Sequence, residues 1–179
     1  MRFWRSMNRS TSRAYTLVEM LVVVTVLGIA GALIVPSFAS TDVLRVQGAV
    51  RTLVADITEA QSDAIAFQRG RALVFYPDEH RYIMAEVNGA TIDTELDRLG
   101  ERRLNLDIFG FTQITGITFQ DNILVYDELG GPVTAPESGV AAPESWLDLT
   151  GSNQTFRVRV EAYTGRVTIE QTAGGIPGP

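Results

Sequence analysis

The chain has 179 residues, which is room for one domain and an anchor but not for two full domains. It contains no cysteine, so disulfides, thiolate metal sites, a cysteine nucleophile and a lipid-modified cysteine are excluded. Lysine is also absent and His80 is the single histidine, which excludes Schiff-base chemistry and leaves little material for a histidine metal site or a Ser-His-Asp triad.

Charge is distributed unevenly along the chain, whose net charge is −6. The first 14 residues hold Arg2, Arg5, Arg9 and Arg13 and no acid, and all 21 acids follow them. An acidic body of this kind repels nucleic acid on average. A basic leader before an apolar stretch instead predicts an N-terminus held on the cytoplasmic side of a membrane.

Residues 15–36 form the most hydrophobic stretch, with no charge between Met20 and Val35. A helix over Tyr15–Val35 is about 31 Å long, enough to cross a hydrocarbon core. The run is longer than the apolar part of a removable signal, and no clear small-residue cleavage site follows it. We therefore predict a transmembrane helix at 15–36, with a plain signal anchor as the alternative. Its one acid is Glu19, and a carboxylate at that depth costs roughly 2–3 kcal/mol.

Residues 37–69 carry apolar side chains at spacings of three and four, which predicts an amphipathic helix that needs a partner surface. The apolar stripe comprises Val43, Val46, Val50, Leu53, Val54, Ile57, Ala60, Ala64 and Ile65. This pattern follows the membrane segment directly, so we predict one helix of about 50 residues, kinked near Pro36. Gly70 is predicted to cap its C-terminus.

From residue 70 the period changes to two, which predicts an antiparallel β domain over 70–179. RALVFYP and HRYIMAEV pair around a turn at Asp78-Glu79, and TGITFQ and NILVYDELGGP follow as two more strands. Residues 88–103 and 132–143 are predicted to be irregular. We expect an α+β fold in which six or so antiparallel strands lay one face on the helix.

The last predicted pair of strands has the clearest alternation. Its inward side chains are Phe156, Val158 and Val160, and its outward ones are Arg157, Arg159 and Glu161. Thr164-Gly165 closes the turn, after which Val167 and Ile169 are predicted to resume the apolar face.

These residues converge on a known family. A basic leader, a small residue, an aromatic and then TLVEMLVVVTVLGIAGALIVP resemble the N-terminus of type IV prepilins and type II secretion pseudopilins. The resemblance covers residues 1 to about 65 and implies a pilin-like fold. It also implies that a prepilin peptidase cuts between Ala14 and Tyr15 and methylates the new amine. Ala14 is a departure, because the family usually has glycine before the cut.

The same resemblance assigns further residues and partners. Glu19 becomes the fifth residue of the mature chain, and Gly28 and Pro36 fall where these proteins commonly carry a glycine and a helix-breaking proline. The implied partners are the peptidase, other pilin or pseudopilin subunits, an inner-membrane assembly platform and membrane lipid. The implied location is the bacterial inner membrane, crossed once, with the C-terminal domain in the periplasm and the protein assembled into a periplasmic or surface filament.

Two segments of the domain are similar to the pseudopilin H / FimT group of minor pilin-like proteins. That group often shows an FD-x-x-G strand end and a terminal Gly-Arg-Val hairpin. The matching positions are Tyr126-Asp127-Glu128-Leu129-Gly130 and Gly165-Arg166-Val167. Ordinary turn chemistry explains either segment equally well.

Glu19 has two interpretations. An acid in a bilayer protonates or finds a cation, and the family resemblance implies that this cation is the N-terminal amine of a neighbouring subunit. Such a buried pair sets the register between subunits. Alternatively, Glu19 lies in the headgroup region as an ordinary residue of a helix N-terminus.

The leading functional prediction is a structural subunit without catalytic activity or cofactor, because no nucleophile elbow, phosphate loop or metal-ligand spacing is present. Asp93, Glu95, Asp97 and Glu101 could hold calcium, but they lack the spacing of a known loop and fit a solvated loop better.

The alternative function is FimT-like DNA binding through Arg157, Arg159 and Arg166, which the net acidic charge of the domain opposes. A membrane-anchored enzyme is a third class. The sequence leaves a secretion pseudopilus and a type IV pilus equally open.

Overall fold

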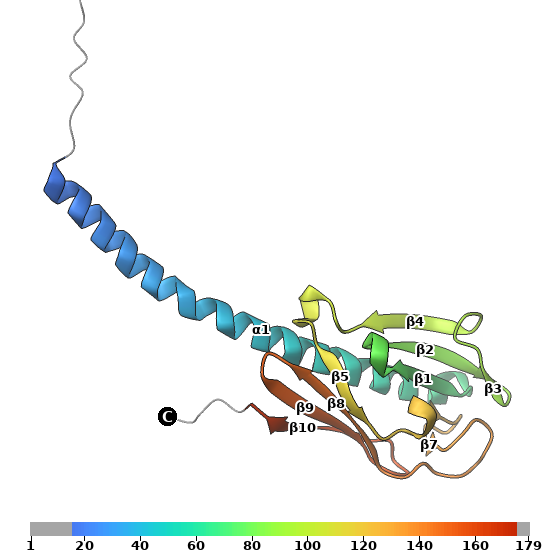
Figure 1. The fold of residues 1–179 in the computed structure, drawn as a ribbon. Coiled ribbons are helices and arrows are strands. Elements are labelled where there is room, and N and C mark those ends of the chain that lie inside the picture. The colour runs from blue at the N-terminus through green and yellow to red at the C-terminus, as the bar shows by residue number, and fades with distance from the viewer. Residues whose placement is uncertain (1–15, 175–179) are drawn as a thin grey trace, which may run out of the picture. The chain divides into compact units, whose positions relative to one another are not determined.

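The computed structural model describes residues 16–174, without the side chains of residues 32–41. The chain divides into two compact units, Met1–Ala39 and Ser40–Pro179. The helix α1, Leu17–Phe67, is the one element common to both (Figure 1). Its 51 residues confirm the predicted single helix of about 50 residues. The helical assignment includes Gly28 and Pro36, and the kink at Pro36 stays a prediction.

In the second unit, α1 buries an apolar stripe. The fully buried members are Val46, Ala49, Val50, Leu53, Ile57, Ala60 and Ala64. This confirms the predicted amphipathic pattern, although Ala49 was not foreseen. Ile65 was predicted to belong to the stripe and does not, because it is 53% exposed at the end of the helix.

The C-terminus of α1 corrects the predicted cap. Gln68, not Gly70, has the left-handed backbone with φ of 49°, and the N–H of Arg69 donates to the carbonyl of Ala64 at 3.2 Å. This is the six-to-one bond of a Schellman motif with glutamine in the usual glycine position. Gly70 is needed for another reason: a Cβ there would lie 2.9 Å from the Cβ of Val87.

The first sheet has six strands in the order β3-β2-β1-β6-β7, with β4 also beside β2. Their bounds are β1 Arg71–Tyr76, β2 Arg81–Asn88, β3 Thr91–Ile92, β4 Arg98–Arg103, β6 Ile123–Tyr126 and β7 Pro132–Val133. The predicted β1–β2 hairpin is confirmed, with a short 3-10 turn η1, Pro77–Glu79, between its strands. The prediction that 88–103 is irregular was wrong, because β4 pairs with β2 along this segment.

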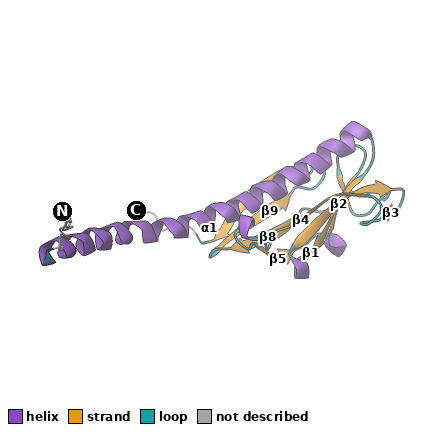
Figure 2. Cartoon of the chain, turned by 90° about the horizontal axis from the view of Figure 1, so that it is seen from above, coloured by secondary structure: helices purple, strands orange, loops and turns teal. Residues whose placement is uncertain are grey.

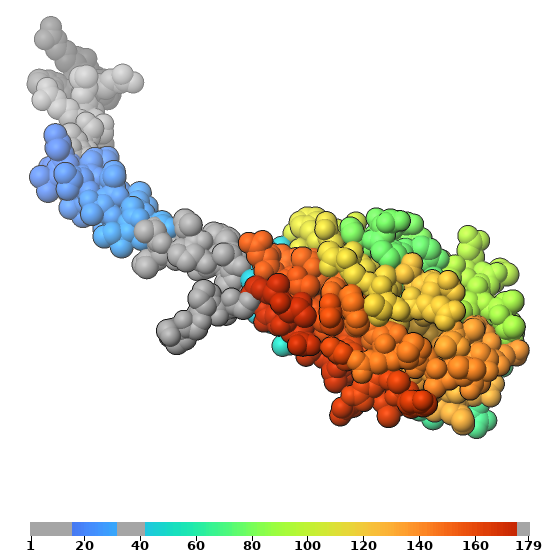
Figure 3. All heavy atoms as spheres, turned by 60° about the horizontal axis from the view of Figure 1, so that its bottom comes forward, coloured from blue at the N-terminus to red at the C-terminus, as the bar shows by residue number. Residues whose placement is uncertain are grey.

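The second sheet has four antiparallel strands in the order β10-β9-β8-β5. Their bounds are β5 Gln113–Ile117, β8 Ser145–Gly151, β9 Gln154–Val160 and β10 Val167–Ala173. Two 3-10 turns, η2 Asp107–Phe109 and η3 Gln120–Asn122, flank β5. The alternation predicted for β9 is confirmed. Ile169 of β10 was predicted to face the core, but it is 48% exposed on an edge strand that forms open surface (Figure 3).

In the second unit α1 lies along the strands of both sheets (Figure 2). One cluster of buried side chains joins the helix to both sheets. It takes Leu53 and Ile57 from the helix, Leu73 and Tyr126 from the first sheet, and Leu149 and others from the second. A smaller cluster of Ala72, Val125 and Val133 lies on the other face of the first sheet. The fold is therefore α+β as predicted, but with two sheets in place of one.

Candidate functional site

The N-terminal end of α1 contains the described part of the predicted processing and assembly signal. Thr16 precedes the helix, and its Oγ1 accepts the N–H of Glu19 at 3.2 Å while its carbonyl accepts the N–H of Met20 at 3.2 Å. Thr16 is thus the N-cap, and Glu19 occupies the N3 position that acids favour in a capping box. Ala14 and Tyr15, the predicted cleavage site, lie outside the described residues.

The apolar residues that follow Glu19 have no cover within their unit. Every described side chain from Thr16 to Gly31 is exposed, with Leu17 at 83% and Leu27 at 65%. A Cβ on Gly28 would meet no atom within 4 Å. Among the residues described, no helix is long and apolar enough to cross a membrane. The predicted segment 15–36 extends beyond the described side chains at both ends.

The two turn segments singled out in the sequence meet at one place. Tyr126 Oη, at the end of β6, donates to the carbonyl of Gly165 in the β9–β10 turn at 3.4 Å. Gln61 Nε2 on α1 donates to the carbonyls of Gly130 at 2.7 Å and Thr164 at 2.8 Å. One helical side chain therefore holds both turns, which we call the two-turn clamp.

The clamp leaves no room for larger residues in its turns. Asp127 Oδ1 accepts the N–H groups of Leu129 and Gly131 at 3.0 and 2.8 Å, which closes the β6–β7 turn. Gly165 has a φ of 65°, and a Cβ there would lie 2.7 Å from Tyr126 Cε1. Burial raises the pKa of Tyr126 well above its usual value, so its hydroxyl stays a donor at physiological pH.

The three arginines of the predicted nucleic-acid patch are all engaged by carboxylates. Arg157 makes two hydrogen bonds of 2.8 Å to Asp148 and stacks 3.7 Å from the centre of the Trp146 ring. The Asp148 hydrogen bonds raise the pKa of Arg157. Arg159 donates to Glu144 and lies 3.6 Å from Glu170.

The third arginine, Arg166, donates to Glu161 from Nη2 at 2.5 Å and from Nε at 3.0 Å. A phosphate backbone would compete with these carboxylates for the arginines. Since all three guanidinium groups are paired with carboxylates, the geometry gives the DNA-binding alternative no support.

The other candidates for chemistry have structural roles. Asp93 Oδ1 accepts the N–H groups of Glu95 and Leu96, an Asx turn that satisfies the carboxylate. His80 Nδ1 accepts the N–H of Ile114 at 3.3 Å. Over the described part of the chain, no three His, Asp or Glu side chains are grouped to hold a metal ion.

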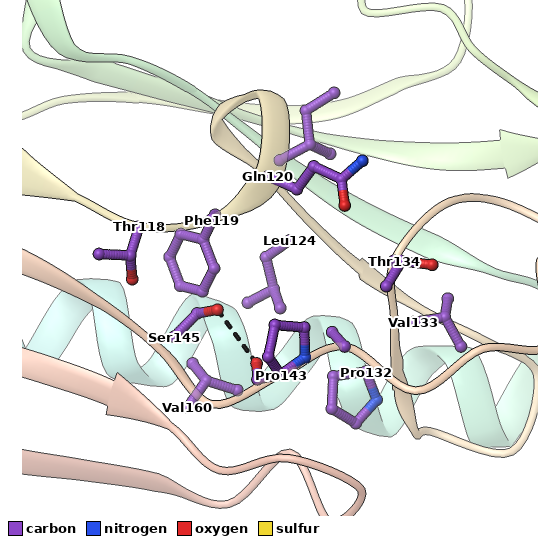
Figure 4. A pocket seen from close by; sticks show the side chains of 12 residues that line it. Thr118, Phe119, Gln120, Leu124, Pro132, Val133, Thr134, Pro143, Ser145 and Val160 are labelled. Atoms are coloured by element: carbon purple, nitrogen blue, oxygen red, sulfur yellow. Dashed lines mark hydrogen bonds between the residues drawn. The ribbon is translucent and has the colours of Figure 1, made fainter.

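A small cavity is lined by Leu124 of the first sheet and by Ser145 and Val160 of the second (Figure 4). It has a volume of about 60 Å³, and its lining is mostly apolar, with Phe119, Leu124 and Val160 among the residues. None of the lining residues is titratable. The one hydrogen bond drawn across it runs from Ser145 Oγ to the carbonyl of Pro143 at 3.0 Å. The polar side chains of the lining are thus the hydroxyls of Thr118, Thr134 and Ser145 and the amide of Gln120.

An ion pair between a buried carboxylate on the helix and a half-exposed arginine on the sheet was not predicted from the sequence. Asp56 is 3% exposed on α1, and its Oδ2 accepts Tyr82 Oη at 2.6 Å and Arg102 Nε at 3.1 Å. Burial, together with the hydrogen bond to Asp56, raises the pKa of Tyr82 far above its usual value. The sequence signal that could have indicated this pair is the position of Asp56 itself, an acid directly before Ile57 of the apolar stripe.

An N-terminal helix with an acid in its first turn, followed by antiparallel sheets packed on its second half, is a pilin-like fold. The chain matches the model of the prokaryotic N-terminal methylation motif over residues 9–35. The structure of the type IV minor pilin FimU from Pseudomonas aeruginosa is similar to this chain. The match has a TM-score of 0.54 and 15% sequence identity, and it covers 75% of this chain and 96% of that chain.

At that identity the likeness to FimU shows the fold alone. No protein of curated function matches the sequence. The motif over residues 9–35 and the pilin-like fold both agree with the resemblance found in the sequence. The narrower assignment to the pseudopilin H / FimT group stays a prediction.

Proposed function

We propose that the chain is a non-catalytic minor pilin or pseudopilin that joins a type IV pilus or a type II secretion pseudopilus. Prepilin peptidase removes residues 1–14, the amine of Tyr15 is methylated, and residues 15–36 anchor the protein in the inner membrane with its domain in the periplasm. The observation that carries the proposal is the methylation motif at 9–35, which leads without a break into α1 of a pilin-like fold.

Glu19 is proposed to act in assembly. It stands in the first turn of a helix whose described neighbours are all exposed, so its carboxylate faces whatever covers that helix. The amine of a neighbouring subunit, set free by cleavage before Tyr15, is a cation of the right charge for this position. A buried pair of this kind is sensitive to the loss of either partner, which makes it a register signal.

The cleavage proposal is tested by intact-mass measurement on the protein purified from membranes. The expected mass corresponds to the loss of residues 1–14 and the addition of one methyl group. Ala14→Gly, which restores the family's usual residue, is expected to be processed at least as completely. A mature protein that retains Met1 would reduce the chain to a signal-anchored domain.

The assembly proposal is tested by Glu19→Ala, with Glu95→Ala as the matched control on an exposed loop. The Glu19 variant is expected to remain membrane-bound and folded but to co-purify poorly with the assembled fibre, because the pairing acid is missing. The control is expected to behave as the wild type. Equal co-purification of Glu19→Ala and wild type would reject the assembly role.

A further inference from the structure

An open groove runs along both sides of the β6–β7 turn, at the end of the domain where α1 finishes. Two hollows of about 480 and 340 Å³ adjoin there and share Asp127, Leu129, Val133 and Gly139. Leu129 is 85% exposed, Tyr163 is 79% exposed and Ile65 is 53% exposed along it. We call this surface, with the two-turn clamp at its floor, the two-turn groove.

The groove is acidic as well as apolar. Glu128 and Glu137 line it and are exposed, and neither lies within 4 Å of a cationic group among the described residues. The two nearby arginines do not compensate them, because Arg69 is paired with Glu86 and Arg166 with Glu161. A surface with large exposed apolar side chains and uncompensated carboxylates fits a partner that presents a cation beside apolar groups.

The described chain itself contains such a cation. Every arginine from Arg45 to Arg166 lies within 4 Å of a carboxylate oxygen, with the exception of Arg51. Arg51 is exposed on α1, on the same helix face as Leu44, Gly48 and Ala55. Leu44 is 64% exposed, and a Cβ on Gly48 would meet no atom of another described segment within 4 Å. This Arg51 face is thus a cation flanked by uncovered apolar and small residues.

We infer that the two-turn groove receives the Arg51 face of α1 from a second copy of the chain. The two surfaces are different, so the contact is heterologous and repeats from copy to copy instead of closing a dimer. Arg51 precedes the groove residues on α1 by 10 to 14 positions, which corresponds to an offset of roughly 15–20 Å along the helix between neighbouring copies. This contact deepens the proposed filament subunit and rests on that proposal.

The contact is tested by cross-linking the full-length protein in lipid bilayers. Because the chain has no cysteine, single thiols are unambiguous. Leu129→Cys is mixed with isotopically labelled Ala55→Cys and treated with a short bismaleimide, and the products are identified by mass spectrometry. The expected product joins position 129 of one copy to position 55 of another. Glu95→Cys replaces Ala55→Cys in the control mixture and is expected to give at most background.

Charge exchange tests the chemistry of the contact. Arg51→Glu is expected to lower the mixed cross-link by about tenfold, because like charges brought together oppose association. Glu128→Arg with Glu137→Arg is expected to do the same, and a mixture in which one copy carries each exchange is expected to recover the cross-link. The inference would be overturned if the double exchange fails to recover the cross-link. It would also be overturned if the yield of the 129–55 product is no higher than in the Glu95→Cys control, or if the only products join identical positions.

The result separates the inference from the proposed function. Wild-type protein that enters the fibre, together with no mixed cross-link, rejects the contact and leaves the subunit role intact. A charge-dependent mixed cross-link, together with a protein that never enters the fibre, supports the contact and rejects the role.

Discussion

Asp56 is a carboxylate buried between α1 and the first sheet, and it depends on two side chains from the sheet. Tyr82 Oη and Arg102 Nε both donate to its Oδ2. The side chain of Arg102 is 48% exposed and that of Asp56 only 5%. Water can therefore replace the lost partner of Arg102 but not that of Asp56. Loss of Asp56 strands the Tyr82 hydroxyl, whereas a freed Arg102 turns to solvent.

Asp56→Ala is therefore expected to lower the free energy of unfolding by about 2 kcal/mol, the usual cost of an unsatisfied buried polar group plus a lost hydrogen bond. Urea unfolding followed by near-ultraviolet circular dichroism measures the change. Glu59→Ala, one turn along at an exposed position, is the control and is expected to stay within about 0.5 kcal/mol of the wild type. Equal effects of the two variants would contradict a special role for Asp56.

The raised pKa values of Tyr82 and Tyr126 predict how the domain responds to alkali. An unfolded tyrosine begins to lose its proton near pH 10, while the folded domain keeps both protons bound. The unfolded state then binds fewer protons, so stability is complete below about pH 10 and falls as the pH rises above it. Tyr82→Phe is expected to flatten this fall, and Tyr163→Phe, at a position 79% exposed, is not. Unfolding free energies measured from pH 8 upward check the slopes, and identical slopes in both variants would refute the linkage.

At the scale of elements, the two-turn clamp ties the β6–β7 and β9–β10 turns to α1. The β6–β7 turn belongs to the first sheet and the β9–β10 turn to the second. Gln61 donates one hydrogen bond to each turn and so holds the two together. Each turn also keeps its own internal bonds, such as those of Asp127 in the β6–β7 turn. The side chain of Gln61 therefore limits the opening of the turns more than it decides whether they form.

Gln61→Ala is expected to speed amide hydrogen exchange in both turns at once, with a modest stability loss of about 1–2 kcal/mol. Mass-spectrometric exchange on the wild type and the variant measures the effect at residues 127–131 and 163–166. Gln47→Ala, also at a half-buried position of α1, is the matched control and leaves these turns unchanged. A change in one turn but not the other would show that the clamp does not act as a unit.

The elements that could be predicted from sequence are those whose periodicity reflects burial. The stripe on α1 and the alternation of β9 are regular because one face of each meets the core, and both were predicted. β4 could not be found this way, since its sequence RLGERR places charges on an edge strand with no fully buried residue. Edge strands of this kind avoid aggregation through charge, which removes the apolar alternation that marks a strand.

Strand β8 is a different case, because its signal was present in the sequence. Leu147 and Leu149 are buried and alternate with Trp146 and Asp148. It directly follows the segment predicted to be a loop, 132–143, and forms the centre of the second sheet beside β9. Without β8, the strands were expected to form one sheet. The prediction of a single sheet was therefore wrong because β8 was not recognised as a strand.

Local sequence marked the two turn segments but could not predict how the fold brings them together. The two turn segments were recognised separately, but their meeting at Gln61 depends on contacts between residues more than 60 positions apart. The pairing of Arg157 with Asp148 and Trp146 likewise needs neighbouring strands in register. A pattern of outward arginines predicts their face but not whether acids on the adjacent strands already neutralise them.

At the scale of the whole molecule, the two units differ in what they contribute to folding. The core of the second unit, among the residues described, begins at Val46, and Leu53 and Ile57 supply its largest helical side chains. The described side chains of the first unit, residues 16–31, are all exposed. The first unit therefore contributes no buried side chain among those described, and the second unit is expected to fold without it.

Two truncations test this division. Deletion of residues 1–39 is expected to leave a domain with one cooperative unfolding transition and a free energy within about 1 kcal/mol of that of the longer chain. Deletion of residues 1–58 also removes Val46, Val50, Leu53 and Ile57, each buried in the core. Removal of one such side chain costs roughly 2–5 kcal/mol, and the total exceeds the stability of an ordinary domain.

The shorter fragment is therefore expected to lack a near-ultraviolet circular dichroism signal and to show no cooperative melting, because both sheets lose most of the helical stripe that covers their inner faces. Thermal melting and amide hydrogen exchange on the two fragments give the comparison directly. A non-cooperative 40–179 fragment would mean that residues before Ser40 stabilise the domain. A cooperative 59–179 fragment would mean that the sheets close their core without the α1 stripe, and either result would reject this assignment of folding and contact to separate units.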